Sequence, residues 1–268
     1  MDIVGRCAVV TGGGHGIGRA LAAALAQRGG RVVVADMDAA RAERVAAEIG
    51  GLPVVCDVGN PASINDLVER ATETYGPVEI FCSNAGMLDE GEGLASTSEQ
   101  LRRIVDVNLL AHVWAAQAVV PAMAERGHGW FVPTISSVAL VSGPMDVGYT
   151  FTKHGVLGLA EWIYLNYATK GVRILCLCPS AVNTGMLGRN EDLEAGQADP
   201  PVPRVSDAIE PEVCAELTLA AMETGGFLVL PHQHVLDSFR AKAADYDTWL
   251  ASTTERVRAI HELMRQGA

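Results

Sequence analysis

The sequence has few aromatic residues and few basic residues, and each shortage excludes a class of structure or partner. Aromatic side chains make up 5% of the 268 residues and hydrophobic residues 49%, so the core has to be built mainly from Ala, Val, Leu and Ile. The formal net charge is -12 and no run of Lys or Arg is present. This balance argues against a nucleic-acid partner and against an anionic membrane surface.

Cysteines are also few, and none forms a metal-binding pattern. The sequence has no C-x-x-C pair and no His/Cys cluster at zinc-finger spacing, so we expect reduced core thiols and no metal. The first residues lack the basic and apolar stretches of a secretion signal, and we expect no segment apolar enough to cross a bilayer. These features predict a cytoplasmic protein. The cysteines are Cys7, Cys56, Cys82, Cys176, Cys178 and Cys214.

Short apolar runs alternate with longer Ala-rich segments of helical period. This βαβα order predicts an α/β fold, a doubly wound parallel sheet with helices on both faces in a Rossmann-like three-layer sandwich. The length fits one such domain over residues 1–268. The expected strands are Cys7–Val10, Arg31–Ala35, Pro53–Cys56, Val78–Cys82, Trp130–Ile135, Val172–Leu177 and Phe227–Leu230. The expected helices are Ile17–Gln27, Ala39–Ile49, Ser63–Tyr75, Leu101–Met123 and Gly155–Tyr167.

Two stretches break this alternation. Residues of about 185–206 contain three prolines and few apolar side chains after position 190, which predicts a substrate lid. The tail at about 234–268 is charged and helix-prone, and from Ser238 to Met264 it offers one apolar face.

A glycine-rich loop, Thr11–Arg19, follows the first expected strand. Its glycines suit a tight turn, close approach to a pyrophosphate and close helix packing, and the helix N–H groups would face the phosphates. Asp36 ends the second strand at the separation expected of a carboxylate that binds the adenosine ribose. An aspartate there could instead cap the next helix, and we assign that role to Asp38.

Tyr149 and Lys153 lie one helical turn apart, so both side chains can enter one site. Upstream, Ser136 and Ser137 follow an apolar strand and deliver hydroxyls to the carboxyl edge of the sheet, where open α/β folds bind ligands.

In this order the motifs resemble the short-chain dehydrogenase/reductase family from Cys7 through Thr184. The resemblance also rests on Asp57-Val58, Ser83-Asn84-Ala85-Gly86, Asn108 and Pro179–Thr184. It implies a catalytic set of Asn108, Ser137, Tyr149 and Lys153. The implied cofactor-binding residues are Gly12, Gly14, His15, Gly16, Ile17, Gly18, Asp36, Met37, Asp57, Val58, Asn84, Ala85, Gly86, Tyr149, Lys153, Pro179, Val182 and Thr184.

The choice of serine depends on register. The segment between the serines and Tyr149 is one residue short of the family pattern, so counting back from Tyr149 favours Ser136. Aligning the strand that ends at Ile135 favours Ser137, which we choose because strand register fixes side-chain direction. Ser83 and Ser180 also replace an Asn and a Gly that are usual in the family.

The resemblance implies hydride transfer between NAD and a secondary alcohol or ketone. Tyr149 would take the alcohol proton as a phenolate favoured by Lys153 and the nicotinamide, Ser137 would hold the substrate oxygen, and Asn108 would support a proton path. An NADPH-dependent ketoreductase of acyl or polyketide intermediates is one alternative, and a catalytically silent nucleotide-binding protein is another. A homotetramer is expected, with Trp162, Tyr164 and Tyr167 at an interface. The apolar residues Val138, Leu140, Met145, Met186 and Leu187 suggest a hydrophobic substrate.

Overall fold

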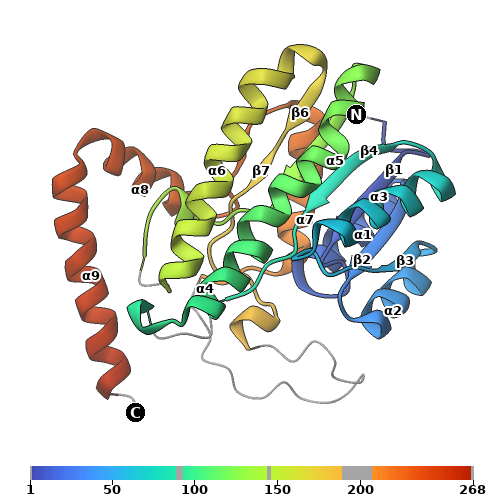
Figure 1. The fold of residues 1–268 in the computed structure, drawn as a ribbon. Coiled ribbons are helices and arrows are strands. Elements are labelled where there is room, and N and C mark those ends of the chain that lie inside the picture. Colours follow the sequence, from blue (N-terminus) through green and yellow to red (C-terminus); the bar gives the residue numbers. More distant parts are fainter. Residues whose placement is uncertain (1, 89–92, 144–145, 189–206, 267–268) are drawn as a thin grey trace.

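Six parallel strands form the central sheet of the computed structural model, which describes residues 2–88, 93–143, 146–188 and 207–266 (Figure 1). The strand order is β3-β2-β1-β4-β5-β6, which confirms the predicted doubly wound fold. The chain builds outward from β1 in one direction and then returns to the other side of β1 with β4. Ligands bind at such a reversal, outside the carboxyl ends of the strands. The bounds are β1 Cys7–Thr11, β2 Arg31–Asp36, β3 Leu52–Val55, β4 Val78–Ser83, β5 Gly129–Pro133 and β6 Val172–Ile174.

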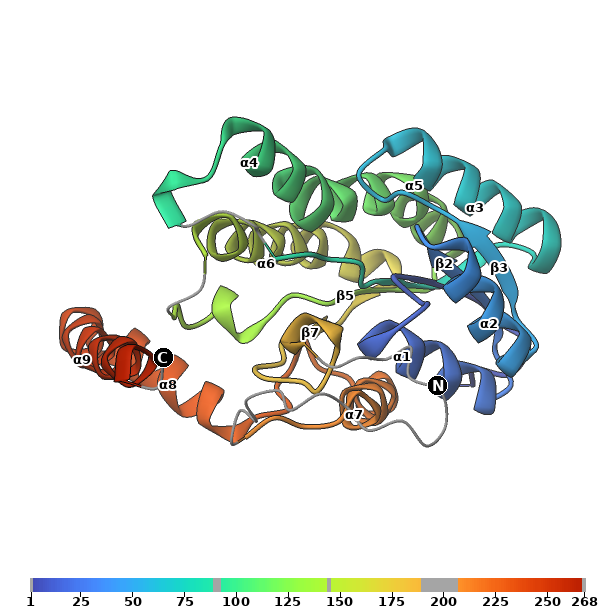
Figure 2. The same cartoon turned by 90° about the horizontal axis from the view of Figure 1, so that it is seen from below.

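Helices cover both faces of the sheet, and Figure 2 shows the three layers from below. Side chains of α1, α2 and α7 form one apolar core with one face of the sheet, and those of α3, α5 and α6 form a second core with the other. Burial of apolar side chains in these two cores stabilises the sheet, whose edge carries the candidate site. The helices are α1 Gly16–Gln27, α2 Ala39–Ile49, α3 Pro61–Tyr75, α4 Ser98–Val105, α5 Ala111–Arg126, α6 Val147–Tyr167 and α7 Pro211–Thr224.

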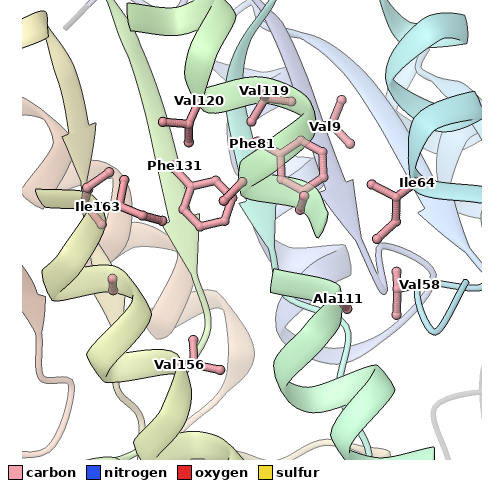
Figure 3. Packing of buried hydrophobic residues seen from close by; sticks show 14 of the residues in the cluster. Val9, Val58, Ile64, Phe81, Ala111, Val119, Val120, Phe131, Val156 and Ile163 are labelled. Atoms are coloured by element: carbon pink, nitrogen blue, oxygen red, sulfur yellow. The ribbon is translucent and has the colours of Figure 1, made fainter. Parts of the chain in front are cut away.

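Two aromatic rings stack where two central strands meet. Phe81 of β4 and Phe131 of β5 stack with ring centroids 6.1 Å apart, beneath Val119 and Val120 of α5 (Figure 3). Both rings are fully buried. They are the only aromatic side chains among the buried members of the second core in the described part of the chain, and the other buried members are mostly aliphatic, as the composition predicts.

The expected strand Val172–Leu177 is wrong in its second half. β6 ends at Ile174, and β7 (Cys176–Leu177) pairs instead with β8 (Leu228–Val229) in a separate two-stranded sheet. The backbone hydrogen bonds change partner at this point: Leu175 N–H bonds to the Phe131 carbonyl of β5, whereas Cys176 N–H bonds to the Phe227 carbonyl, beside β8. Helix α7 was not expected from the sequence, although Pro211 occupies its first turn, where proline is favoured.

Three helices also differ from expectation. The expected helix Leu101–Met123 is α4 and α5 joined by a π-helical segment, Asp106–Leu110, and α6 begins at Val147 rather than Gly155. The C-terminal tail forms two helices, α8 (Gln233–Ala244) and α9 (Tyr246–Gln266), because the backbone between them is extended at Asp245. In Figures 1 and 2 α9 lies beside α8 at the margin of the molecule. Most of the expected lid, residues 189–206, lies outside the described residues.

All six cysteines are buried free thiols, as predicted. The expectation that no segment is apolar enough to cross a membrane is wrong on composition alone, because Ser98–Arg126 passes that test. Half of its apolar window is buried inside the protein, against α3 and α6. Core helices with this packing commonly pass the same test, so it is weak evidence for a membrane span.

Candidate active site

The loop between β1 and α1 requires glycine at several positions, for its backbone conformation or for lack of space. Gly12 has a φ of +62°, a region that side chains other than glycine rarely adopt. A Cβ on Gly18 would overlap the Gly12 carbonyl and lie 2.7 Å from Nδ2 of Asn84. The glycines therefore let α1 start directly against the sheet edge, with its first N–H groups directed at the cleft.

Asp36 lies against this loop at the end of β2. Its Oδ2 accepts the Gly14 N–H at 2.9 Å and its Oδ1 accepts the Asp38 N–H at 3.0 Å, and the residue is 7% exposed. A Cβ on Gly14 would lie 2.8 Å from Oδ2, so the close approach requires glycine. Asp38 caps α2 by accepting the Arg41 N–H, as predicted. Met37 is 69% exposed, beside the carboxylate in sequence.

Asn84 ties three strand ends together. Its Nδ2 donates to the Thr11 carbonyl at 3.0 Å, and its Oδ1 accepts from Oγ1 of Thr134 at 2.9 Å. The backbone N–H groups of Asn84 and Ala85 both donate to Oγ1 of Thr11. Both Asn84 side-chain groups thus hold strand ends together, and the residue shapes the predicted cofactor site through the scaffold.

Asp57 is held by a cation from another element. Arg103 of α4 bonds both of its carboxylate oxygens, at 3.1 and 3.3 Å, and the Gly59 N–H donates to Oδ1. Burial raises the pKa of Asp57, but the bonds from Arg103 and Gly59 outweigh it, and the net pKa lies below its usual value. Asp57 is a structural anion at the end of β3, and the buried Val58 follows it.

Asn108 lies in the π-helical segment and clamps the chain beyond β4. Its Oδ1 accepts the Met87 N–H at 2.8 Å, and its Nδ2 donates to the Met87 carbonyl at 2.7 Å. A Cβ on Gly86 would lie 3.4 Å from Oδ1 of Asn108 and 3.5 Å from Nζ of Lys153. Asn108, Gly86 and Lys153 therefore meet at one point, as the sequence predicts.

Tyr149 and Lys153 lie on the first turns of α6, both buried. Nζ of Lys153 is 5.4 Å from the centre of the Tyr149 ring and donates to the Thr134 carbonyl at 3.2 Å. Burial lowers the pKa of Lys153 to about 8. Burial also raises the pKa of Tyr149, aided by Asp146, while a hydrogen bond from Ser136 opposes the rise. In the protein alone the phenol is therefore protonated near neutral pH, and the expected lowering by Lys153 is not found.

The hydroxyl that acts on Tyr149 belongs to Ser136, whereas the sequence analysis chose Ser137. That choice carried the strand register through Ile135, and the backbone pairing does extend past β5, because Thr134 N–H bonds to the Ser83 carbonyl and Ile135 N–H to that of Leu177. After Ile135, Ser136 caps the short 3-10 helix Ser137–Ala139, with Oγ accepting the Val138 N–H at 3.2 Å. The structure therefore brings the Ser136 hydroxyl, which counting back from Tyr149 favours, to the phenol.

The segment after β7 returns to the same edge. The Pro179 carbonyl accepts the Ser137 N–H at 2.8 Å, so this segment lies against the serines. Val182 is buried and bridges Ile209, and the half-buried Thr184 precedes a 3-10 turn, Gly185–Leu187. These positions suit the predicted wall of a nicotinamide pocket.

A small apolar cluster packs on Tyr149, separate from the two main cores. It joins Ile104 of α4 and Val138, with Met87 and Leu88 against them. Of these, only Val138 was expected from the sequence, because the others come from segments that only the fold brings together. Leu140 is fully buried and Met186 is 42% exposed, whereas Met145 lies outside the described residues.

Comparison with known proteins agrees with this geometry. The sequence model described as short chain dehydrogenase matches residues 6–195. The chain belongs to the short-chain dehydrogenase family. Cyclohexanol dehydrogenase of Acinetobacter sp. (strain SE19) is 33% identical over 238 residues, covering 87% of this chain and 93% of the relative. A 2,5-dichloro-2,5-cyclohexadiene-1,4-diol dehydrogenase of Sphingobium indicum is 35% identical over 73% of this chain and 80% of its own length. A short-chain dehydrogenase/reductase of Burkholderia phymatum, solved in complex with NAD, superposes with a TM-score of 0.81 at 28% identity, covering 92% of this chain and 96% of that one.

This short-chain dehydrogenase has groups that fit a dinucleotide. Gly12, Gly14 and Gly18 leave a cradle that side chains would fill, and Nδ1 of His15 is buried with no hydrogen-bond partner among the described residues. The half-buried residues Gly16 and Ile17 begin α1, where helix N–H groups attract phosphate. The loop would hold the pyrophosphate and Asp36 the ribose.

A buried histidine, His112, was not identified from the sequence. It is 1% exposed, and neither ring nitrogen has a partner among the described residues. Burial, with a smaller contribution from Lys153, lowers its pKa to about 3. It lies one helical turn after Asn108, and that spacing is the signal that could have placed it near the site.

Proposed function

We propose that this chain is an NAD-dependent dehydrogenase that interconverts an alicyclic secondary alcohol and its ketone. The observation that carries the proposal is the meeting of three groups from separate segments: the buried phenol of Tyr149, the Ser136 hydroxyl bonded to it and the Lys153 ammonium beside its ring. A buried phenol with a hydroxyl and a cation at hand is suited to moving a proton to or from an alcohol oxygen.

Each residue has a distinct part in the proposed reaction. Ser136 donates a hydrogen bond to the substrate oxygen and orients it toward Tyr149. Tyr149 takes the alcohol proton during oxidation and returns it during reduction. Lys153 holds its ammonium beside the Tyr149 ring through the bond to the Thr134 carbonyl, and Asn108 fixes the Met87 backbone nearby. A bound nicotinamide would supply the hydride acceptor for the carbinol carbon and a positive charge that favours the phenolate.

The preference for NAD over NADP rests on Asp36. Two backbone N–H groups fix its carboxylate and leave further lone pairs to accept ribose hydroxyls. The nearby cations are already paired, Arg41 with Asp38 at 3.6 Å and Arg19 with Glu48 at 2.9 Å. These pairs reduce the chance of an arginine reaching a 2′-phosphate, so that phosphate would face an anion.

The substrate class rests on the apolar cluster at Tyr149. Ile104, Val138 and Met87 put aliphatic and thioether side chains against the ring, and these favour a compact hydrocarbon over a charged or extended one. Relatives named for cyclohexanol and for a cyclohexadiene diol support an alicyclic ring in this place.

The test is a purified-enzyme assay that follows NADH absorbance at 340 nm in the presence of cyclohexanol and substituted cyclohexanols. Linear secondary alcohols of equal carbon number are assayed separately as comparison substrates. β-Ketoacyl thioesters with NADPH test the ketoreductase alternative. We expect alicyclic alcohols with NAD to give the highest kcat/KM. Turnover of only the thioester with NADPH would favour the alternative, and NADH binding without any turnover would favour a silent nucleotide-binding protein.

A further inference from the structure

Helix α8 contacts the segment between the serines and Tyr149, although it lies beyond the part of the chain that the family pattern matches, residues 6–195. Nζ of Lys242, on α8, donates a 2.9 Å hydrogen bond to the carbonyl oxygen of Leu140. Leu140 lies between Ser136 and Tyr149 in the sequence and is itself 2% exposed. The contact therefore joins the tail to the segment that carries the catalytic serine.

Leu140 ends the single helical turn that Ser136 begins. The Ser136 hydroxyl caps the first end by accepting the Val138 N–H, and the N–H groups of Leu140 and Val141 both bond to the Ser137 carbonyl. Carbonyls at the end of such a turn lack a donor within it, and a lysine ammonium there satisfies one and complements the local dipole. Lys242 is thus the cap at the second end of the turn.

The ammonium of Lys242 is held in place by two aromatic rings of α9. It lies 5.5 Å from the centre of the Tyr246 ring and 5.1 Å from that of Trp249. Trp249 is 5% exposed, and its Nε1 donates to Oγ of Ser238 at 3.1 Å, which ties α9 back to α8. Cation–π contacts of this kind favour a fixed cation over a mobile one. The extended residue Asp245 separates the two helices, and the start of α9 then contacts α8 through Tyr246 and Trp249.

We propose that Lys242 is a positioning residue, which holds the turn from Ser136 to Leu140 and so fixes both the Ser136 hydroxyl and Val138, which packs on Tyr149. The proposal rests on the proposed function. Its consequence is that α8 and α9 are part of the active-site framework. A loosened turn would misplace the hydrogen bond to the substrate oxygen and leave the dinucleotide site at Asp36 intact.

The experiment compares Lys242→Met with Lys242→Arg and with Lys170→Met. Lys170 is the matched control, because it also lies over a tyrosine ring, that of Tyr167 at 4.8 Å, but far along α6 from the turn. We expect Lys242→Met to lower kcat/KM for the alcohol by about tenfold with little change in KM for NAD. Arginine keeps a donor and a cation–π contact, so Lys242→Arg should restore most of the rate.

Hydrogen exchange of the intact enzyme separates this proposal from the assigned reaction. In Lys242→Met the amides of 138–141 should exchange faster than in wild type, while those of β1 and α1 stay protected. Unchanged exchange at 138–141 would overturn the proposal, and so would faster exchange with an unaltered kcat/KM. A wild type that turns over no alcohol would refute the proposed function, while the exchange result would still show whether Lys242 holds the turn.

Discussion

The backbone N–H of Gly14 donates a 2.9 Å hydrogen bond to Oδ2 of Asp36, which fixes a buried carboxylate against the glycine-rich loop. The strand β2 and the helix α1 thereby present one anion at the point where a dinucleotide ribose would lie. The carboxylate cannot turn away without losing this bond and the one from Asp38 N–H, so its charge is fixed at this point.

The first prediction follows from that carboxylate. Wild type should favour NAD over NADP in kcat/KM by at least about 10- to 100-fold, from a charged hydrogen bond of about 1.5–3 kcal/mol and added repulsion. Asp36→Ala should narrow the ratio, chiefly by losing NAD activity. Glu73→Ala is the control, since it removes an exposed carboxylate on α3 and leaves Asp36 and the ion pair of Arg41 with Asp38 intact. Equal use of both cofactors by wild type would refute the assignment.

The second prediction separates the two serines. Ser136→Ala should lower kcat/KM for the alcohol by about 100-fold or more, as for loss of a donor to a developing oxyanion. Ser137→Ala should stay close to wild type, because the structure uses the Ser137 backbone, bonded to Pro179 and to Leu140, in holding the turn. Steady-state kcat/KM values of the two variants show which serine holds the substrate oxygen. A larger loss of kcat/KM in Ser137→Ala than in Ser136→Ala would favour Ser137, as the strand register did.

The third prediction concerns Tyr149. Tyr149→Phe should lower kcat by about 100- to 10,000-fold while NADH binding, followed by fluorescence, stays near wild type. Burial raises the pKa of the Tyr149 phenol, so the rate of alcohol oxidation by wild type should increase as pH rises toward that pKa. The Tyr149→Phe variant should lack this increase of rate with pH. Lys153→Ala should damage both turnover and NADH binding. A phenylalanine variant that keeps most of the rate where chemistry is limiting would exclude Tyr149 as the proton carrier.

The sequence was sufficient for the sheet and the cofactor loop because both depend on local patterns. Alternating apolar runs specify parallel strands, and the spacing from Gly12 to Gly18 specifies a turn that only glycine allows. The sequence could not show which serine faces Tyr149, because Ser136 caps a 3-10 turn just after the strand, a change of direction that no local pattern records.

Other features needed tertiary contacts that the sequence does not display. The π-helical segment accompanies a clamp between Asn108 and Met87, residues 21 positions apart. The clamp of Lys242 on Leu140 joins residues 102 positions apart. The apolar cluster at Tyr149 likewise assembles from separated segments. In each case the contacting residues belong to no sequence motif that would predict the contact.

The fourth prediction is a homo-oligomer, with a tetramer expected. On α6, Trp162 is 57% exposed and Leu165 is 79% exposed, whereas Tyr164 is partly covered by an edge contact with Phe227. Exposed aromatic and aliphatic side chains on one helix are typical interface material. Light scattering should give a multiple of 28.3 kDa, reduced in the double variant Trp162→Glu/Leu165→Glu. Val4→Glu, at a residue 70% exposed elsewhere, is the control, and a monomer mass for wild type at micromolar concentration would exclude the oligomer.

The last prediction concerns His112 and the stability of the fold at acid pH. Its pKa is lowered to about 3 in the folded protein, against 6.5 as its ordinary value, so it binds protons more readily when the chain unfolds. Its effect on stability is therefore negligible above pH 6.5 and becomes increasingly unfavourable as pH falls toward 3. From pH 7 to pH 5 this one group should cost wild type about 2 kcal/mol of unfolding free energy.

His112→Leu should remove that cost, since leucine fills a similar volume without burying two unpartnered nitrogens. Urea unfolding at pH 7 and pH 5, at one protein concentration, measures the difference. We expect wild type to lose about 2 kcal/mol more than His112→Leu over this range. His234→Leu, at a side chain 56% exposed, is the control and should follow wild type. Parallel losses in wild type and His112→Leu would mean that His112 takes up its proton equally in both states, which its burial beside Lys153 argues against.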